Sequence, residues 1–188
     1  MPPNPSFHRT PCTPLAAGAT AAQIIRHFQR CALPSLDAEL KWFATQRTLL
    51  GAIRRAAVAR GQNGNRLSHQ WRLPRQMYPS ALVRLTAIAP TLRACSTFSD
   101  LYKVIESSVG SLNGVGPLYL YDAALRIGAF LKLKPSDVYL QAGALKGAKR
   151  LLPRVHMRSL PPNVFPAPYS ALPPYQLENL LCCYRSLL

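Results

Sequence analysis

The spacing of apolar residues predicts a series of short amphipathic helices. A first candidate covers residues 19–32 and ends before Pro34. From Ser35 to about Arg60 the pattern is strongly helical, and the basic residues lie largely off its apolar face. The apolar residues that share this face are Phe43, Leu50, Ile53 and Ala57. We therefore expect one continuous helix here, packed on a core through that face.

Glycine and proline divide the middle of the chain. Residues 61–65 (Gly-Gln-Asn-Gly-Asn) predict a turn. Residues 66–79 have no clear period and end in a proline, so we expect a basic loop there, with one aromatic side chain at Trp71. Helical character resumes at residues 80–89, and Pro90 interrupts or restarts the helix.

Two predicted helices flank a glycine-rich turn. The residues Thr97–Asp100 resemble a capping box and start a helix that runs to about Ser108. The second helix runs from Pro117 to Leu131, and proline is tolerated in such a first turn. A third helix is expected to open at Lys134–Asp137 and to end near Arg150, because proline and aspartate both suit a helix start.

Both ends of the chain are rich in proline. Residues 1–14 hold five prolines and predict an extended or disordered lead-in, and residues 153–174 hold seven prolines and predict an extended arm. A last amphipathic helix at residues 174–187 is expected to dock on the core. Its apolar stripe consists of Leu177, Leu180, Leu181 and Tyr184.

These elements predict an all-α fold, because no strand pattern and no internal repeat is visible in the sequence. We expect three parts. Residues 1–34 form the lead-in with its short helix, and residues 35–152 form a compact helical domain that contains the paired helices of residues 101–131. Residues 153–188 form the arm and the docking helix.

Positive charge is the strongest signal in the composition. Lys and Arg number 23 against 7 Asp and Glu, and no acidic residue lies between Glu39 and Asp100. The basic residues of that stretch are Lys41, Arg47, Arg54, Arg55, Arg60, Arg66, Arg72, Arg75, Arg84 and Arg93. Charge of one sign favours a polyanionic partner, nucleic acid before an anionic membrane. A ribosomal type of basic composition or a GC-rich genome is the alternative explanation.

The cysteines and the apolar runs bear on location. The five cysteines are odd in number and irregularly spaced, which predicts a reducing compartment, no zinc site and a cytoplasmic protein, nucleoid-associated if bacterial. No apolar run reaches the roughly 18 residues that a membrane span needs. Residues 1–33 lack acids, as a mitochondrial presequence does, but their prolines oppose an amphipathic helix.

Residues 101–128 carry the most informative motif. Gly114-Val115-Gly116 forms a turn between two helices, where glycine permits backbone that other residues avoid. The amide groups at the start of the following helix, together with its dipole, suit a phosphate group. A corner whose glycines serve packing alone is the alternative.

At this turn the chain resembles the helix-hairpin-helix family of DNA-binding elements. The family pattern of a leucine, two glycines around an apolar residue and a later apolar position is matched by Leu112, Gly114, Val115, Gly116 and Leu120. The resemblance implies contact with a phosphate backbone through hairpin amides, without dependence on base sequence. It covers under a sixth of the chain.

The DNA glycosylase superfamily that carries this hairpin also resembles the chain over residues 138–152. That resemblance implies a catalytic Asp near the start of a later helix, but Gln141 stands there, and Leu118 stands where lyase-type members carry a Lys. Asp122 and Asp137 are the remaining candidate acids. An ion pair with Arg126 and a helix N-terminal position are the plainer explanations for these two residues.

The remaining site candidates are basic and aromatic. Trp71 in the basic loop is a candidate platform for a base, with His69 as a weak catalytic candidate, although Trp71 anchoring the loop to the core is an equal explanation. The expected phosphate contacts are Arg54, Arg55, Arg66, Arg72, Arg75, Lys146, Lys149 and Arg150. His27 has no partner at metal-ligand spacing. No nucleotide-binding or hydrolase motif occurs, and we expect no metal and no cofactor.

The sequence therefore predicts a protein that binds nucleic acid, double-stranded DNA first, through backbone phosphates. A divergent glycosylase-like enzyme acting on modified or damaged bases is the first alternative. A protein–protein adaptor, with the C-terminal stripe exposed to a partner helix, is the second.

Overall fold

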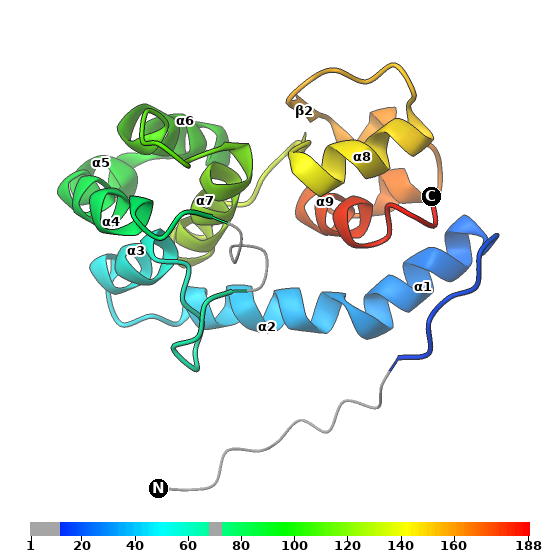
Figure 1. Ribbon diagram of the computed structural model, residues 1–188, viewed down its shortest axis with the longest axis horizontal. Coiled ribbons are helices and arrows are strands. Elements are labelled where there is room, and N and C mark those ends of the chain that lie inside the picture. Colours follow the sequence, from blue (N-terminus) through cyan, green and yellow to red (C-terminus); the bar gives the residue numbers. More distant parts are fainter. Residues whose placement is uncertain (1–11, 68–72) are drawn as a thin grey trace, which may run out of the picture.

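A computed structural model describes residues 12–67 and 73–188 of the chain, and within them it contains nine α-helices and one pair of very short strands. The first five helices are α1 (Ala21–Cys31), α2 (Leu33–Ala44), α3 (Leu49–Ala57), α4 (Met77–Ala87) and α5 (Ala89–Ala94). The others are α6 (Phe98–Val109), α7 (Pro117–Leu131), α8 (Ala142–Leu151) and α9 (Pro174–Cys183). Figure 1 shows α3 to α7 on one side, α8 and α9 with α1 on the other, and α2 along both.

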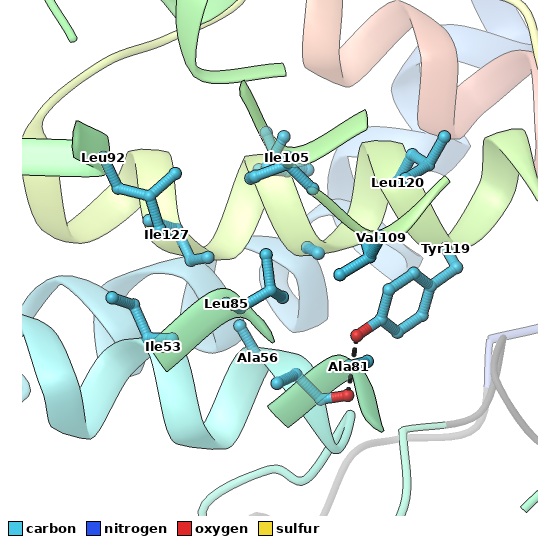
Figure 2. Packing of buried hydrophobic residues seen from close by; sticks show 14 of the residues in the cluster. Ile53, Ala56, Ala81, Leu85, Leu92, Ile105, Val109, Tyr119, Leu120 and Ile127 are labelled. Carbon is cyan, nitrogen blue, oxygen red and sulfur yellow. Dashed lines mark hydrogen bonds between the residues drawn. The ribbon is translucent and has the colours of Figure 1, made fainter. Parts of the chain in front are cut away.

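The first hydrophobic cluster surrounds α7. This helix packs against α2, α3 and α6, and its residues from Tyr119 to Gly128 are all buried except Asp122. Figure 2 shows Leu85 and Ile105 converging on α7 from α4 and α6. The Tyr119 hydroxyl donates a hydrogen bond of 2.8 Å to the Ala57 carbonyl at the end of α3. Helix α7, which follows the glycine turn in the sequence, is thus the central helix of the first hydrophobic cluster.

The helices on both sides of the glycine turn are confirmed. The Thr97 side chain accepts a hydrogen bond from the Asp100 amide at the start of α6, and Pro117 opens α7. Local signals set these ends, because a capping side chain and an N-terminal proline act within one turn of helix. Pro90 likewise lies in the first turn of α5, so it restarts the helix.

The expected continuous helix over residues 35–60 is wrong. The chain breaks after α2 ends at Ala44, and Thr48 caps the separate helix α3 by accepting a hydrogen bond from the Gly51 amide. The break changes which face is buried: Leu49 is buried, whereas Leu50 is 41 % exposed. Pro34, expected to follow a helix end, lies in the first turn of α2, where a proline is tolerated.

The predicted helix start at Lys134–Asp137 is also wrong. The next residues form the strand β1 (Val138–Tyr139), which pairs antiparallel with β2 (Ser159–Leu160). Helix α8 begins only at Ala142, after Gln141 in extended backbone. The strand pair returns residues of the proline-rich arm to the core, since Leu160 pairs with Val138 and both side chains are buried.

A second hydrophobic cluster joins α1, α8 and α9. The expected docking of the C-terminal helix is confirmed, because the four residues of its stripe are all buried. Helices α8 and α9 cross very closely. A Cβ added at Gly147 would overlap the Leu181 carbonyl, and one at Gly143 would lie 2.5 Å from the Cys182 sulfur. The division of the chain at residues 34 and 152 stays a prediction.

The expectation that the cysteines are reduced is wrong for one pair. Cys12 and Cys31 form a disulfide bond across a sequence separation of 19 residues. Cys31 is the last residue of α1, so the bond ties the preceding segment to this helix. Irregular spacing along the chain concealed the pair, because distant residues carry no pairing signal in a single sequence. Cys95, Cys182 and Cys183 are free thiols.

We predict that Gly147→Ala lowers the stability of the fold. The added methyl group meets a backbone carbonyl that cannot move independently, so we expect a loss of about 1–3 kcal/mol. Thermal unfolding followed by circular dichroism measures the effect. Lys146→Ala, at an exposed position of the same helix, serves as the control and should be nearly neutral. Equal melting temperatures for Gly147→Ala and the wild type would contradict the close crossing.

We predict that Cys12→Ser lowers the melting temperature under oxidising conditions. A disulfide bond that closes a loop of this size lowers the conformational entropy of the unfolded chain and so stabilises the fold by about 3 kcal/mol. The difference from wild type should vanish in excess reductant, because both chains then lack the bond. Cys95→Ser changes a cysteine outside the disulfide and controls for loss of a thiol. A melting difference that persists in reductant would show that Cys12 acts in another way.

Candidate functional site

The two glycines of the hairpin turn have different structural roles. Gly114 has a φ of +89°, in the left-handed region that favours glycine, and a Cβ there would lie 2.8 Å from Pro74 Cγ. Gly116 has a φ of −128°, and a Cβ added there would have no described atom within 4 Å. The fold therefore requires Gly114, while Gly116 leaves open space beside the turn.

The open space lies at the start of α7. Gly116 precedes the helix, and no described side chain caps it. The first amide groups of a helix lack intrahelical partners and carry the positive end of its dipole. Anion binding at this helix start stays a prediction, with which the uncapped amides are compatible. Val115, between the glycines, is half-buried and packs against the first hydrophobic cluster.

The described end of the basic loop, from residue 73 on, lies against this turn. Pro74 contacts Gly114, and Arg75 follows it in the chain with an exposed side chain. Arg66, at the other end of the loop, lies over the Tyr78 ring at 4.7 Å. Packing, which the sequence could not show, thus brings Pro74 and Arg75 to the hairpin.

Helix α3 presents two further predicted residues. Arg54 and Arg55 are exposed, and the guanidinium of Arg55 lies 5.8 Å from the centre of the Trp42 ring. Helix α3 packs against both α4 and α7, so these charges belong to the same half of the molecule as the hairpin. A guanidinium group that lies over an aromatic ring has less conformational freedom, but its positive charge can still interact with a phosphate.

Arg84 is one of the basic residues of the acid-free stretch, but its position beside the hairpin was not predicted from the sequence. Its Nη1 donates hydrogen bonds to the Ser108 carbonyl at 3.1 Å and to Ser111 Oγ at 3.0 Å. It thereby connects α4 to the end of α6, directly before the hairpin turn. A basic side chain at a helix C-terminus satisfies carbonyls that lack helical partners.

Three predicted residues lie on the other side of the molecule. Lys146, Lys149 and Arg150 are exposed on α8, within the second cluster, and Figure 1 shows α8 apart from α3 and α4. The candidate basic residues therefore occupy two separate surfaces. His69, Trp71 and Arg72 lie outside the described residues.

The candidate acids have different environments. Asp122 Oδ2 lies 3.4 Å from Arg126 Nη2, so the expected ion pair is present. Arg126 has a second partner that the sequence did not reveal, because its Nε donates to Glu39 at 2.8 Å. Asp137 lies before β1 and is half-exposed. The structure does not bring Asp137 into the same site as Asp122.

A cleft of about 730 Å³ lies beside this ion pair. Its walls come from α2, the turn at residues 61–67, α7 and α9. Among its lining residues are Glu39, Asp122 and Glu178, three of the seven acidic residues of the chain. These acids converge in a protein whose net charge is +16.

Glu178 is the most buried of these acids. Burial, with a contribution from the negative charge of Asp122, raises the pKa of Glu178 well above its ordinary value of 4.5. Gln141 Nε2 donates to Glu178 Oε1 at 2.8 Å. The glycosylase resemblance implied an Asp at position 141, and the structure places a carboxyl group beside that position from a residue far along the chain.

Cys12, His27 and Cys31 form a separate group. One potential ligand atom from each lies within 4.8 Å of the other two, a grouping that the spacing in the sequence did not reveal. The two sulfur atoms are bonded to each other, and His27 Nδ1 lies 2.7 Å from the Tyr184 hydroxyl. In the oxidised state this group supports α1 against α9.

No family model, curated protein or solved structure matches the chain. None of the described helices combines the length and the apolar character that crossing a bilayer requires. The adaptor hypothesis in the form that the sequence suggested is wrong, since the stripe on α9 that was to meet a partner helix is buried within this chain.

We predict that Glu178 makes the stability depend on pH. Because its pKa is raised on folding, the native state holds a proton that the unfolded chain has lost above pH 4.5. The stability that this proton confers is complete at lower pH and declines as pH rises toward the folded pKa. Urea unfolding at a series of pH values should show this decline in wild type and a shallower one in Glu178→Gln. Parallel profiles for the two proteins would refute the assignment.

Proposed function

We propose that the protein binds double-stranded DNA through backbone phosphates, with the hairpin of α6 and α7 as its centre. The observation that carries this proposal is the uncapped start of α7 next to a basic loop, held there by the contact of Pro74 with Gly114. Helix amides and guanidinium groups are both phosphate ligands. Because amides and guanidinium groups lie close together on this face, we expect a DNA phosphate backbone to make its most favourable contacts there.

The surrounding charge supports the same proposal. Arg54, Arg55 and Arg75 are exposed in the same half as the hairpin, and each can approach a phosphate without unburying the core. Contacts of this kind hold a duplex in place but do not distinguish bases. The binding is therefore mostly independent of sequence and falls steeply with salt. The residues on α8 offer a second, separate surface for a longer or bent duplex.

The membership of the helix-hairpin-helix family belongs to this proposal. It rests on the residues of the turn and on the agreement of both helix bounds with the motif. The glycosylase alternative gains no such support, because Asp122 forms an ion pair with Arg126 and Asp137 does not lie in the same site as Asp122. Binding without base release is the function that the described residues favour.

We predict that Gly116→Val weakens duplex binding while the fold persists. The valine side chain fills open space at the helix start and blocks a phosphate, so we expect roughly a tenfold loss of affinity. The blocked amides carry no net charge, so the slope of affinity against salt should stay close to that of wild type. Fluorescence anisotropy with a labelled duplex at several salt concentrations measures both quantities. Gly114→Val is unsuitable, because it strains the backbone and meets Pro74.

The matched control is Ser107→Val, which adds the same side chain on an exposed position of α6. It should bind like wild type. Single-stranded DNA and RNA of equal length complete the comparison, and duplex should bind best. Equal binding of all three nucleic acids, with Gly116→Val unchanged, would show that the charge acts non-specifically and would overturn the hairpin proposal.

A further inference from the structure

The cleft beside Arg126 is lined by more acidic than basic residues, whereas basic residues predominate in the chain as a whole. Its lining residues include three acids and one base, although basic residues outnumber acidic ones 23 to 7 in the whole chain. The acids come from three helices, with Glu39 on α2, Asp122 on α7 and Glu178 on α9. The fold therefore gathers scarce negative charge at one place.

Arg126 provides an independent sign of a ligand. Its side chain is only 4 % exposed and is part of the cleft wall. Nε and Nη2 are bound to Glu39 and Asp122, but Nη1 has no hydrogen-bond partner among the described residues. A buried N–H of a charged group that lacks an acceptor destabilises the fold. Nη1 is itself buried, and an acceptor atom that reaches it from the cleft removes that destabilisation.

The rest of the wall suits an organic molecule. Trp42, Leu36 and Leu67 supply an apolar side, and Asn63 and Asn179 supply amide groups. The volume of about 730 Å³ lies within the range of small-molecule sites. The wall thus combines an apolar surface with a few placed polar groups.

We propose that this cleft binds a small organic cation that also carries a carboxylate or carbonyl oxygen, as a free basic amino acid does. The positive nitrogen lies among Asp122, Glu39 and Glu178, and the oxygen accepts a hydrogen bond from Arg126 Nη1. An anion alone is repelled by the acids, and a cation alone leaves Nη1 unsatisfied. Both groups are needed on one molecule. The site does not depend on nucleic acid binding.

Glu178 couples this binding to protons. It faces Asp122 and Tyr121 of α7, Cys182 and Cys183 of its own helix, and the amide of Gln141. None of these is a cation, and burial favours the neutral acid. A positive nitrogen in the cleft stabilises the carboxylate, so the bound ligand lowers the pKa of Glu178 and releases a proton. The affinity for the ligand therefore rises with pH as long as the pH is below the pKa of Glu178 in the ligand-free protein.

The test is isothermal titration calorimetry of the full chain with L-arginine as the probe. Guanidinium ion and acetate, the two halves of the required chemistry, are titrated separately. We expect L-arginine to bind at least about tenfold more tightly than either half, because only the whole molecule satisfies Nη1 and the acids together. Repetition in two buffers of different ionisation enthalpy shows the released proton.

Two variants remove the same charge at different places. Asp122→Asn keeps the size of the side chain and leaves Glu39 paired with Arg126, and it should weaken L-arginine by about tenfold. Asp37→Asn removes an exposed acid of α2 that is not part of the cleft wall, and it should change affinity by less than about twofold. Thermal unfolding checks that both variants fold.

The proposal is overturned if none of the probes binds, if guanidinium ion binds as tightly as L-arginine, or if Asp122→Asn and Asp37→Asn weaken the probe equally. DNA binding by Gly116→Val and by these variants is measured on the same preparations. Because the hairpin and the cleft use different residues, either proposal can fail while the other stands.

Discussion

The buried guanidinium of Arg126 is the constraint around which this molecule is organised. It lies on α7, the helix at the centre of the first cluster, and binds Glu39 of α2 and Asp122 one turn earlier. A buried charge is tolerated only with partners, and removal of one partner typically costs about 3–5 kcal/mol. The Phe43 ring lies 6.0 Å from the same group. Separation of α2 from α7 would therefore expose the Arg126 guanidinium to solvent or leave it buried without Glu39 as a partner.

The same constraint separates the two signs of charge in space. Carboxylates drawn toward Arg126 are withdrawn from the surface, where they would have neutralised arginines. The exposed basic residues of α3, α8 and the loop before α4 consequently face solvent with few opposing acids. The DNA-binding surface and the cation cleft that we propose would both follow from this one arrangement.

Local signals in the sequence were sufficient for some elements. Thr97 and Pro117 fixed the starts of α6 and α7 because capping and proline geometry act within a single turn. The break between α2 and α3 was missed because apolar spacing continues through it, and only packing decides that Leu49 rather than Leu50 is buried. The pairing of Val138 with Leu160 is too short to leave an alternating pattern.

Most of the cleft could not have been predicted. Arg126 and Glu39 are 87 residues apart, and Gln141 and Glu178 are 37 apart. A single sequence holds no periodicity over such distances. The i,i+4 pair of Asp122 with Arg126 was predictable because helix geometry alone brings those side chains together. The hairpin was likewise predictable as two helices and a turn, but not its contact with Pro74.

The close crossing of α8 and α9 has a consequence for the energetics of recognition. The backbones of α8 and α9 are in contact at Gly147, which restricts the movement of α8 against α9. Within α8, helix geometry places the Cα atoms of Lys146 and Arg150 about 6 Å apart along the axis. Charges on such a fixed frame lose little backbone entropy when they meet a partner. Only the side-chain rotamers of these residues remain to be ordered.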